Sequence, residues 1–363
     1  MLLSLSVIKS IRNREVGEMQ SIAHNTSKVK KMNEELIRQV LRTLRTGTKS
    51  QIAQITGLSV ATCGTLLGEM LQSGEALEDE PEASSGGRRA RRFVYNADYS
   101  HIACICAVYE QGHPQLTYVV TDSFGHTLER RSQKAAEIDE ASIDTLLGVL
   151  LEKYPQIKAI GIGIPGLTHE GVVHICDAAA LVGVPLARRI RERYGVRVIV
   201  ENDMNLTVYG LYREREWQES ATIAAMAFVE GCFPGAGMIV DGQIHRGSSR
   251  FAGEVSFLPF GISREEQLRQ LHIKATFIPL AAHAVASLTA IVNPQWIALM
   301  GGQVEAADLP AIREHVLSFI PTEHMPELTF LDNPKKPYEE GLIAMTLESL
   351  AYSLQLVEKS RPG

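Results

Sequence analysis

The sequence is poor in cysteine, and its few cysteines do not suggest a disulfide framework. There are 5 in 363 residues, an odd number at scattered positions: Cys63, Cys104, Cys106, Cys176 and Cys232. Disulfide-dependent secreted chains carry cysteines in even number at regular spacings. This usage therefore favours a reduced, cytoplasmic protein.

Long apolar runs and a targeting segment are also lacking. We count no run near the roughly 18 to 20 apolar residues that a membrane span needs, and we expect no membrane partner. The apolar start "MLLSLSVI" has no charged residue before it and is followed at once by "KSIRNRE", which is unlike a signal peptide. With 45% apolar and 21% charged residues, the 363-residue chain has material for two or three packed domains.

Charge is uneven along the chain. Residues 1–98 hold 14 Lys and Arg against 11 Asp and Glu, whereas the other residues hold 22 against 31. A basic front on an acidic body predicts an anionic partner for the front alone, with a solvated charged face as the alternative. The basic residues gather in "KVKK" (28–31), "GGRRARR" (86–92) and at Arg38, Arg42, Arg45 and Lys49.

Apolar spacing predicts three helices within this basic front. The first is marked by Leu36, Ile37, Val40, Leu41 and Leu44, with Gly47 as its stop. A second helix is expected over about 49–55 and a third over about 59–73. Gly57 would supply the turn between them, and Ser59 would cap the third helix. The "A-x-x-T-G-L-S-x-x-T" arrangement, followed by an arginine-rich strand, predicts a helix-turn-helix whose third helix reads DNA.

The third helix divides into an apolar face and a face of short polar residues. Short side chains allow the helix backbone to approach a duplex, but they discriminate bases weakly. We therefore assign part of the specificity to a wing within "SSGGRRARRFVYN", with a flexible charged linker as the alternative. The predicted DNA-binding residues are Lys49, Ser59, Thr62, Gly64, Thr65, Arg88 and Arg89. The expected domain spans 29–95, after an N-terminal tail over 1–28.

From residue 96 onward the pattern changes to three successive strands followed by alternating helices and strands, and it occurs twice. This predicts a duplicated α/β domain with a ligand cleft between its halves. The stretch "GIGIPG" fits G-x-G-x-x-G, but Pro165 and "LTHEG" lead into a loop rather than a helix. A dinucleotide site is therefore not expected, because it needs a helix N-terminus at the pyrophosphate.

The ordered motifs of the chain resemble the ROK group of repressors, open reading frames and sugar kinases. They are "GIGIPG", "VENDMN", "GMIVDGQIHRG", "FAGEVSF" and "NPQWIALMGG". The resemblance implies a winged helix-turn-helix followed by an actin-like (ribonuclease H-like) two-lobed sugar kinase fold over 96–363. Lobe 1 would take about 96–204 plus a C-terminal helix at 341–359, and lobe 2 about 205–340.

The resemblance also implies a sugar site. Asn202 and Asp203 match the pair that binds sugar hydroxyls, and Asp203 takes the position of the catalytic base. Glu254 matches a further hydroxyl ligand, and Gly166 a backbone position lining the same pocket. Two structural alternatives stay open, namely that Asn202 and Asp203 cap a helix from 205, and that Glu254 ties the two lobes together.

The chain departs from the family at both phosphate-binding hairpins. Cys106 stands near the position of the first hairpin's Asp, and Val108 near that of its Gly. In the second hairpin, Glu230 places negative charge where phosphate would lie, and Phe233-Pro234 adds bulk. Phosphoryl transfer depends on positioned amides and cations, so we expect no kinase activity and regard Asp203 as a vestigial base.

The family's zinc site is also missing from the sequence. Phe257 occupies the position of the zinc-binding His, and no cysteine follows Cys232. We therefore expect no metal at this site and no cofactor, and we interpret Cys104 and Cys106 as core residues.

The leading hypothesis is a non-catalytic transcriptional regulator of carbohydrate-related genes, acting as a repressor. It would bind operator DNA as a homodimer or homotetramer and respond to a small-molecule effector such as a sugar or sugar phosphate. One alternative is a DNA-binding protein whose kinase-like body is only an oligomerisation or partner scaffold. The second is a residual ATP-dependent sugar kinase.

Overall fold

The computed structural model describes residues 25–79, 90–110, 112–169, 171–215, 217–218 and 220–350. The chain divides into two compact units. The first comprises Met1–His101, Asp122–His126 and Ser349–Gly363, and the second Ile102–Thr121 and Thr127–Glu348. Each unit is described by itself.

The first unit packs three helices against a small antiparallel sheet with strand order β1-β3-β2. The helices are α2 (Asn25–Leu44), α3 (Lys49–Thr56) and α4 (Val60–Gln72), and the strands are β1 (Thr46–Thr48), β2 (Ala76–Asp79) and β3 (Arg92–Tyr95). All three predicted helices are confirmed. Their apolar faces share one core, which includes Ile37, Leu41, Ile52, Cys63, Leu67 and Phe93.

Local capping explains the helix boundaries. Ser59 caps α4 by accepting a hydrogen bond from the amide of Thr62, and Gly57 ends α3 with a φ of 72°, as predicted. The expectation that Gly47 stops the first helix is wrong. The chain leaves α2 through Arg45, which takes a left-handed φ of 66°, and Gly47 lies inside β1.

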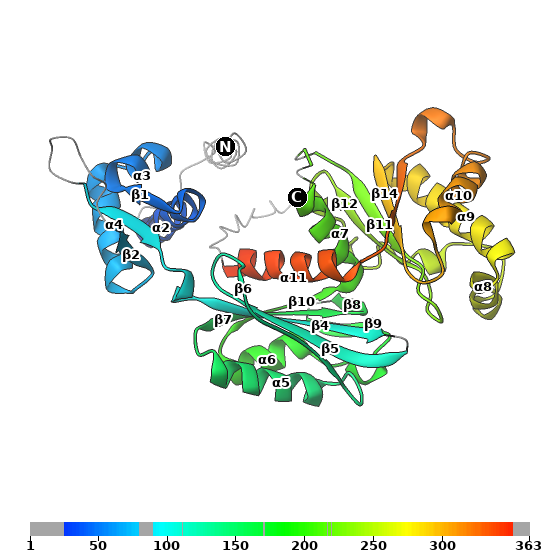
Figure 1. The fold of residues 1–363 in the computed structure, drawn as a ribbon, viewed down its shortest axis with the longest axis horizontal. Helices are drawn as coiled ribbons and strands as arrows, with labels where there is room; N and C mark the ends of the chain where they lie inside the picture. Colours follow the sequence, from blue (N-terminus) through cyan, green and yellow to red (C-terminus); the bar gives the residue numbers. More distant parts are fainter. Residues whose placement is uncertain are drawn as a thin grey trace, which may run out of the picture. The chain divides into compact units, whose positions relative to one another are not determined.

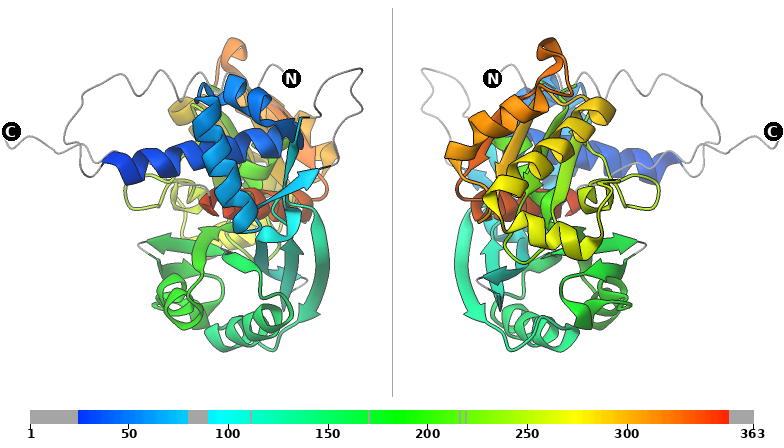
Figure 2. Two further views of the ribbon diagram at one scale, coloured as in Figure 1. Left: turned by 90° about the vertical axis from the view of Figure 1, so that its left-hand side faces the viewer. Right: turned by 90° about the vertical axis from the view of Figure 1, so that its right-hand side faces the viewer.

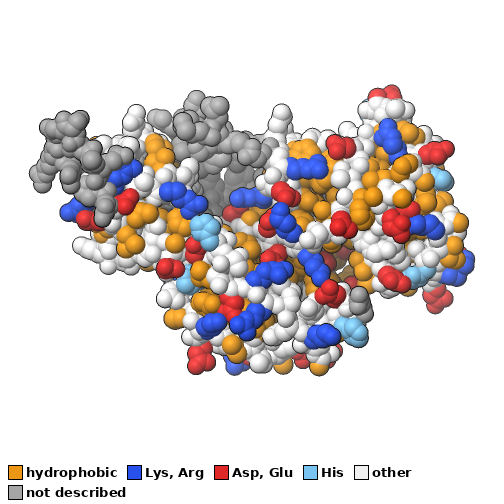
Figure 3. Space-filling model, viewed as in Figure 1, with side chains coloured by type: hydrophobic (Ala, Val, Ile, Leu, Met, Phe, Trp, Pro, Cys, Tyr) orange, Lys and Arg blue, Asp and Glu red, His pale blue; other side chains and the backbone are white. Residues whose placement is uncertain are grey.

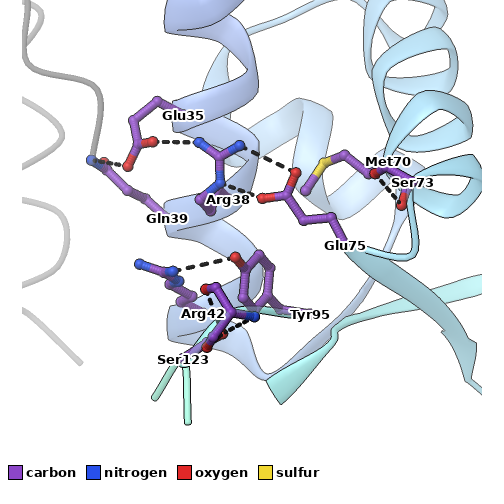
Figure 4. A network of polar contacts seen from close by, with 10 residues as sticks. Glu35, Arg38, Gln39, Arg42, Met70, Ser73, Glu75, Tyr95 and Ser123 are labelled. Carbon is purple, nitrogen blue, oxygen red and sulfur yellow. Dashed lines mark hydrogen bonds and ion pairs between the residues drawn. The ribbon is translucent and has the colours of Figure 1, made fainter. Parts of the chain in front are cut away.

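A buried ion-pair network ties α2 to the start of β2 (Figure 4). The Arg38 guanidinium donates hydrogen bonds to the carboxylates of Glu35 and Glu75. Both carboxylates belong to residues that are only 6% exposed, so removing Arg38 would leave two buried charges without their cation.

The second unit contains two five-stranded mixed sheets. The first has strand order β10-β7-β4-β5-β6. Its strands are β4 (His101–Glu110), β5 (His113–Thr121), β6 (Thr127–Lys134), β7 (Ile157–Ile164) and β10 (Arg197–Asn202). Helices α5 (Glu140–Lys153) and α6 (Leu186–Tyr194) cover one face, and α11 (Lys335–Leu350) covers the other (Figure 1).

The second sheet repeats this layered arrangement with strand order β13-β12-β11-β14-β15. Its strands are β11 (Ile223–Ala227), β12 (Gly235–Val240), β13 (Gln243–Ile244), β14 (Trp296–Met300) and β15 (Glu327–Leu331). Helices α9 (Lys274–Val292) and α10 (Leu309–Val316) lie on one face, with α8 (Arg264–Leu271) beside α9 (Figure 2). Helix α7 (Asp203–Glu214) packs on the other face. The duplicated α/β architecture is therefore present.

Three details of this unit differ from the sequence-based expectations. After Pro165 the chain forms β8 (Gly166–His169), which pairs with β9 (Val172–Cys176), where we expected a loop. No helix begins there, which agrees with the exclusion of a dinucleotide site. The C-terminal helix begins at Lys335 rather than at 341, and residues 351–359 lie outside the described part. Helix α7 begins at Asp203 rather than at 205, because Asn202 caps it.

One apolar helix also corrects our count of apolar runs. Helix α9 is 19 residues long with a mean hydropathy of 1.8, so it passes a length and composition test for a membrane span. Half of this segment is buried inside the protein, and α9 packs into the core of the second sheet. Among the residues that the structure describes, no other helix passes the test.

Two helices of the second unit cross at glycines. A Cβ on Gly210 of α7 would overlap the carbonyl oxygen of Pro337, and a Cβ on Gly341 of α11 would overlap that of Leu206. The two backbones are therefore in direct contact.

Gly341→Ala is expected to lower the free energy of unfolding by about 2 kcal/mol, because the new methyl group overpacks this crossing. The matched control is Gly148→Ala in the interior of α5, where the nearest atom to a new Cβ is 3.9 Å away. There the better helix propensity of alanine should raise stability by up to about 1 kcal/mol. Urea titrations of both variants measure this difference, and equal effects would contradict the role given to the crossing.

Candidate functional site

The exposed face of α4 carries the residues predicted to contact DNA. Ser59 and Thr65 are exposed, and Thr62 and Gly64 are partly exposed. Their hydroxyl groups are already engaged locally. Ser59 Oγ and Thr62 Oγ1 are 2.8 Å apart, and Thr65 Oγ1 donates to the carbonyl oxygen of Ala61. These side chains thus reinforce the first turns of the helix, which supports the expectation that they discriminate bases weakly.

Lys49 and Gly64 lie together although 15 positions separate them. A Cβ built on Gly64 would lie 3.2 Å from Lys49 Cδ and 3.4 Å from its Nζ. The lysine therefore extends from the start of α3 across the surface of α4. The absence of a side chain at Gly64 leaves room for this cation next to the helix backbone.

An apolar residue on the same surface was missed by the sequence reasoning. Val60, the first residue of α4, is 48% exposed. The sequence reasoning considered polar and charged residues as DNA contacts, and a valine next to a helix N-cap is neither. Its methyl groups could contact a thymine methyl in a major groove.

The predicted wing is described only in part. Strands β2 and β3 pair in antiparallel fashion, but Arg88 and Arg89 lie outside the described residues. Of the neighbouring arginines, Arg91 makes an exposed ion pair with Glu78 at 2.7 Å. Arg92 donates a hydrogen bond to Thr46 Oγ1.

In the second unit, Asn202 connects two of the predicted ligand-site residues. Its Nδ2 donates to the carbonyl oxygen of Gly166 at 3.2 Å and to Asp203 Oδ1 at 3.1 Å. Its Oδ1 accepts from the amide of Asn205 at 3.0 Å, so Asn202 is the N-cap of α7. The capping alternative is thus confirmed for Asn202. Gly166 itself can bear no side chain, because a Cβ there would overlap the backbone of Ile175 and Cys176.

Asp203 and Glu254 come close enough to act on one another electrostatically, together with a third acid, Asp177. Burial raises the pKa of Asp203 to about 7, assisted by the negative charges of Asp177 and Glu254 and opposed by the amide of Met204. The pKa of Glu254 is also raised, first by burial and then by Asp177, while Arg264 lowers it. Exclusion of solvent raises the pKa of Asp177 as well.

Asp177 is a site residue that the sequence reasoning missed. It directly follows β9, and its amide donates to the carbonyl oxygen of Pro165 at 3.0 Å. The pairing of Gly166 with Cys176 brings Asp177 close to the start of β8, where Asn202 donates to the carbonyl oxygen of Gly166. The signal available in the sequence was an acidic residue directly after the apolar stretch 172–176. Three carboxylates can accept hydrogen bonds from hydroxyl or ammonium groups, and they repel phosphate.

A buried salt bridge is formed by Glu201, two residues before Asp203 in the chain. Glu201 is 5% exposed and accepts hydrogen bonds from Arg246 Nε at 2.8 Å and Asn205 Nδ2 at 3.0 Å. A second Arg246 nitrogen lies 2.7 Å from the same carboxylate. This pair joins the end of strand β10 to the segment that follows β13, and so connects the two halves of the second unit.

Phe257, at the position of the family's zinc-binding histidine, takes part in an aromatic stack. The Arg264 guanidinium lies 3.7 Å from the ring centre of Phe233 and 4.2 Å from that of Phe257. Phe251 approaches Phe257 at 5.1 Å between ring centres. The Arg264 cation is attracted to the faces of both rings. The described residues contain no cluster of three potential metal-binding side chains.

The strand corresponding to the first phosphate hairpin is apolar and closed. Cys106 is 4% exposed, and burial raises the pKa of its thiol well above its usual value. The predicted assignment of Cys104 and Cys106 to the core is confirmed, since Cys104 is fully buried. The second hairpin position, Glu230, is exposed.

Charge on the visible face of the second unit is mixed. Lys and Arg side chains alternate with Asp and Glu side chains over its helices and sheets (Figure 3). No single-sign field of the kind that attracts a nucleic acid covers this face.

The chain resembles proteins of one family. A model of the ROK family matches residues 106–267. The xylose repressor of Caldicellulosiruptor bescii is 26% identical over 242 residues, which cover 64% of this chain and 59% of that protein. The xylose repressor of Bacillus subtilis is 24% identical, over 63% of this chain and 61% of that protein. The chain thus spans about three fifths of the length of these curated relatives. The N-acetyl-D-glucosamine kinase of Histophilus somni is 26% identical over 37% of this chain and 47% of that protein.

Solved structures show the same architecture. A ROK family transcriptional regulator, homologous to the E. coli Mlc protein, superposes with a TM-score of 0.63 at 16% identity, covering 88% of this chain and 99% of that chain. A ROK family glucokinase from Streptomyces griseus, solved with glucose and AMPPNP, gives a TM-score of 0.50 at 18% identity over 69% of this chain and all of that chain. Residues 106–267 thus match the ROK family model, and the chain shares the fold of these ROK family structures.

Proposed function

We propose that this chain is a DNA-binding transcriptional repressor whose kinase-like domain senses a small hydroxylated effector without phosphorylating it. Two observations together carry this proposal. In the first unit, α4 is capped by Ser59 and has an exposed polar face. In the second unit, three acids lie close together, while the strand expected to bind phosphate is buried at Cys106. Relatives named as xylose repressors support it. Cytoplasmic location follows from the same proposal.

Within the first unit, we assign residues 29–95 to a winged helix-turn-helix. Helices α3 and α4 would form the helix-turn-helix, and the β2–β3 hairpin would form the wing. Lys49, Ser59, Thr62, Gly64 and Thr65 would contact DNA, together with Arg88 and Arg89 of the wing. An operator with two half-sites requires two DNA-binding domains, so the active species would be a homodimer or a homotetramer.

Within the second unit, we assign effector binding to Gly166, Asn202, Asp203 and Glu254, and we add Asp177. The assigned ligand-binding domain begins at residue 96, with lobe 1 running to 204 and lobe 2 from 205. The negative charges favour a neutral sugar over a sugar phosphate, because a phosphate would meet three carboxylates. Such an effector regulates DNA binding only if its affinity differs between two states of the protein.

Gly64→Ala is expected to raise the stability of the protein and to weaken its DNA binding. The added methyl group improves helix propensity by up to about 1 kcal/mol, and the flexible end of Lys49 can move away from it. The same methyl group holds a duplex away from the helix, so affinity should fall about tenfold, the scale of one lost contact. A DNA fragment selected from a random library with the wild-type protein serves as the probe, in fluorescence anisotropy.

The matched control is Gly68→Ala, one turn further along α4, where nothing lies within 4 Å of a new Cβ. It should gain the same stability and keep its affinity. Equal DNA affinities for the wild type and Gly64→Ala would refute the proposed approach of this helix.

The raised pKa of Asp203 predicts a pH dependence of stability. Its pKa rises from 3.8 to about 7, so between these values the folded state binds the proton more tightly than the unfolded state. The free energy of unfolding should therefore fall as pH rises from about 4 to about 7. Asp203→Asn should flatten this profile, as measured by chemical denaturation at several pH values, whereas a parallel profile for the variant would exclude Asp203 as its source.

Ligand preference is tested with D-xylose, N-acetyl-D-glucosamine and glucose 6-phosphate in isothermal titration calorimetry. We expect heat from at least one neutral sugar, abolished by Asp203→Ala, and none from the phosphate ester. Binding should strengthen between pH 6 and 8, because an ionised Asp203 accepts hydroxyl hydrogen bonds better than a protonated one. Silence towards all sugars would favour the scaffold alternative, and turnover of ATP with any of them would favour the kinase.

A further inference from the structure

Two exposed phenylalanines of the second unit lie side by side. Phe251 is 41% exposed and Phe257 is 50% exposed, and their ring centres are 5.1 Å apart. Exposed apolar side chains that are scattered singly are normal on a protein surface. Two aromatic rings in contact form a continuous apolar patch instead, and such patches are typical of binding surfaces.

The backbone places Glu254 between these two phenylalanines. The amide of Glu254 donates to the carbonyl oxygen of Phe251 at 3.3 Å, and the amide of Phe257 donates to that of Glu254 at 3.0 Å. Gly253, one position before Glu254, takes a φ of 99° and accepts a hydrogen bond from the amide of Ala236 at 2.8 Å. The carboxylate and both rings therefore belong to one hydrogen-bonded segment, which is attached to strand β12.

Arg264 links the rings to the carboxylate. Its guanidinium lies 4.2 Å from the ring centre of Phe257 and 3.7 Å from that of Phe233. Burial and then Asp177 raise the pKa of Glu254, and the charge of Arg264 lowers it. The same cation thus acts on the acid and on the ring faces.

Phe233 brings this cluster to the other two acids. It directly follows Cys232, and the pKa of that thiol is raised by burial and then by the charges of Asp177 and Asp203. The loop that carries Phe233 therefore borders the acid-lined site. The aromatic rings and the acids are neighbouring parts of one region of the second unit.

We propose that Phe251, Phe257 and Arg264 form a subsite for an aromatic group attached to the sugar. The inference rests on the proposed function and names the class of ligand for the same site. The effector would be a neutral glycoside, with its hydroxyl groups on the acids and its aromatic aglycone on the two phenylalanines.

An aromatic aglycone gains from both kinds of group in this subsite. Its ring stacks on phenylalanine or meets it edge-on, and its face attracts the guanidinium of Arg264. A second sugar ring could place C–H groups against the phenylalanines, but it offers no π face to the cation. The combination of rings and arginine therefore favours an aryl glycoside over a disaccharide.

Isothermal titration calorimetry of the full chain tests this inference with matched glycosides. The probes are the methyl and phenyl glycosides of D-xylose and of N-acetyl-D-glucosamine in both anomeric forms, so that the members of each pair differ only in the aglycone. We expect at least one phenyl glycoside to bind about tenfold more tightly than its methyl partner, the scale of one aromatic contact. A ratio near one in every pair would overturn the inference. Equally tight binding of xylobiose would also overturn it, because a second sugar ring would then serve as well.

Substitutions at Phe257 assign the gain to its ring. Phe257→Leu keeps an apolar side chain without a π face, so the ratio of phenyl to methyl affinity should fall to near one while the methyl glycoside still binds. Phe257→Tyr should keep the ratio. The matched control Phe319→Ala removes a 58% exposed phenylalanine elsewhere and should keep it too. An unchanged ratio in Phe257→Leu would contradict the subsite, and so would an equal loss of both affinities.

The same titrations separate the subsite from the proposed function. Binding of methyl glycosides without any preference for phenyl would support the proposed function and refute the subsite. Binding of phenol that depends on Phe257, without any contribution from a sugar, would support the subsite and count against the proposed function. Silence towards every probe would refute both.

Discussion

The crossing of α7 and α11 is the constraint on which the second unit depends. Helix α7 leaves the first sheet at the end of β10 and packs on the second sheet, whereas α11 follows the second sheet and packs on the first. Helix α11 packs closely on the first sheet. A Cβ on Gly161 would overlap Thr346, and a Cβ on Gly163 would overlap Tyr338. Where the two helices meet, only glycine fits at Gly210 and Gly341. The separation of the two sheets therefore follows from backbone contact, which cannot adjust as a side-chain contact can.

The chemistry of the proposed ligand site follows from this placement. Helix α7 begins at Asp203, so the crossing that positions α7 also positions this carboxylate against Asp177 and Glu254. Below it, the Glu201–Arg246 pair connects the same strand end to the second sheet. Ionisation of Asp203 carries a free-energy cost, chiefly because the side chain is buried and in part because Asp177 and Glu254 are nearby, so its pKa is raised to about 7. Hydroxyl donors would relieve that cost, and a phosphate would increase it.

Some of the residues expected at the functional positions of a sugar kinase are present in this chain, and others are replaced. Asn202 and Asp203, the pair in the sequence motif, lie at the end of β10 and the start of α7, and Asn202 donates a hydrogen bond to the carbonyl oxygen of Gly166. Cys106, near the family's first phosphate hairpin, is enclosed in the sheet, and Arg264 makes cation–π contacts with Phe233 and Phe257. Carboxylates and a side-chain amide are groups that can bind hydroxyls, so the retained residues are compatible with the proposed sensing of a sugar.

The sequence by itself determined the local elements and the family motifs. Helical spacing placed α2, α3 and α4, and residues such as Ser59 and Gly57 fixed their ends, because capping depends on a few neighbouring residues. It misplaced the end of α2, because Arg45, in a left-handed conformation, ends the helix and Gly47, the predicted stop, does not. Only the tertiary structure brought Asp177 to Asp203, Lys49 across Gly64, and Arg264 to Phe233 and Phe257. Such contacts join residues far apart in the chain, and they are set by how the sheets and helices pack, which no local pattern encodes.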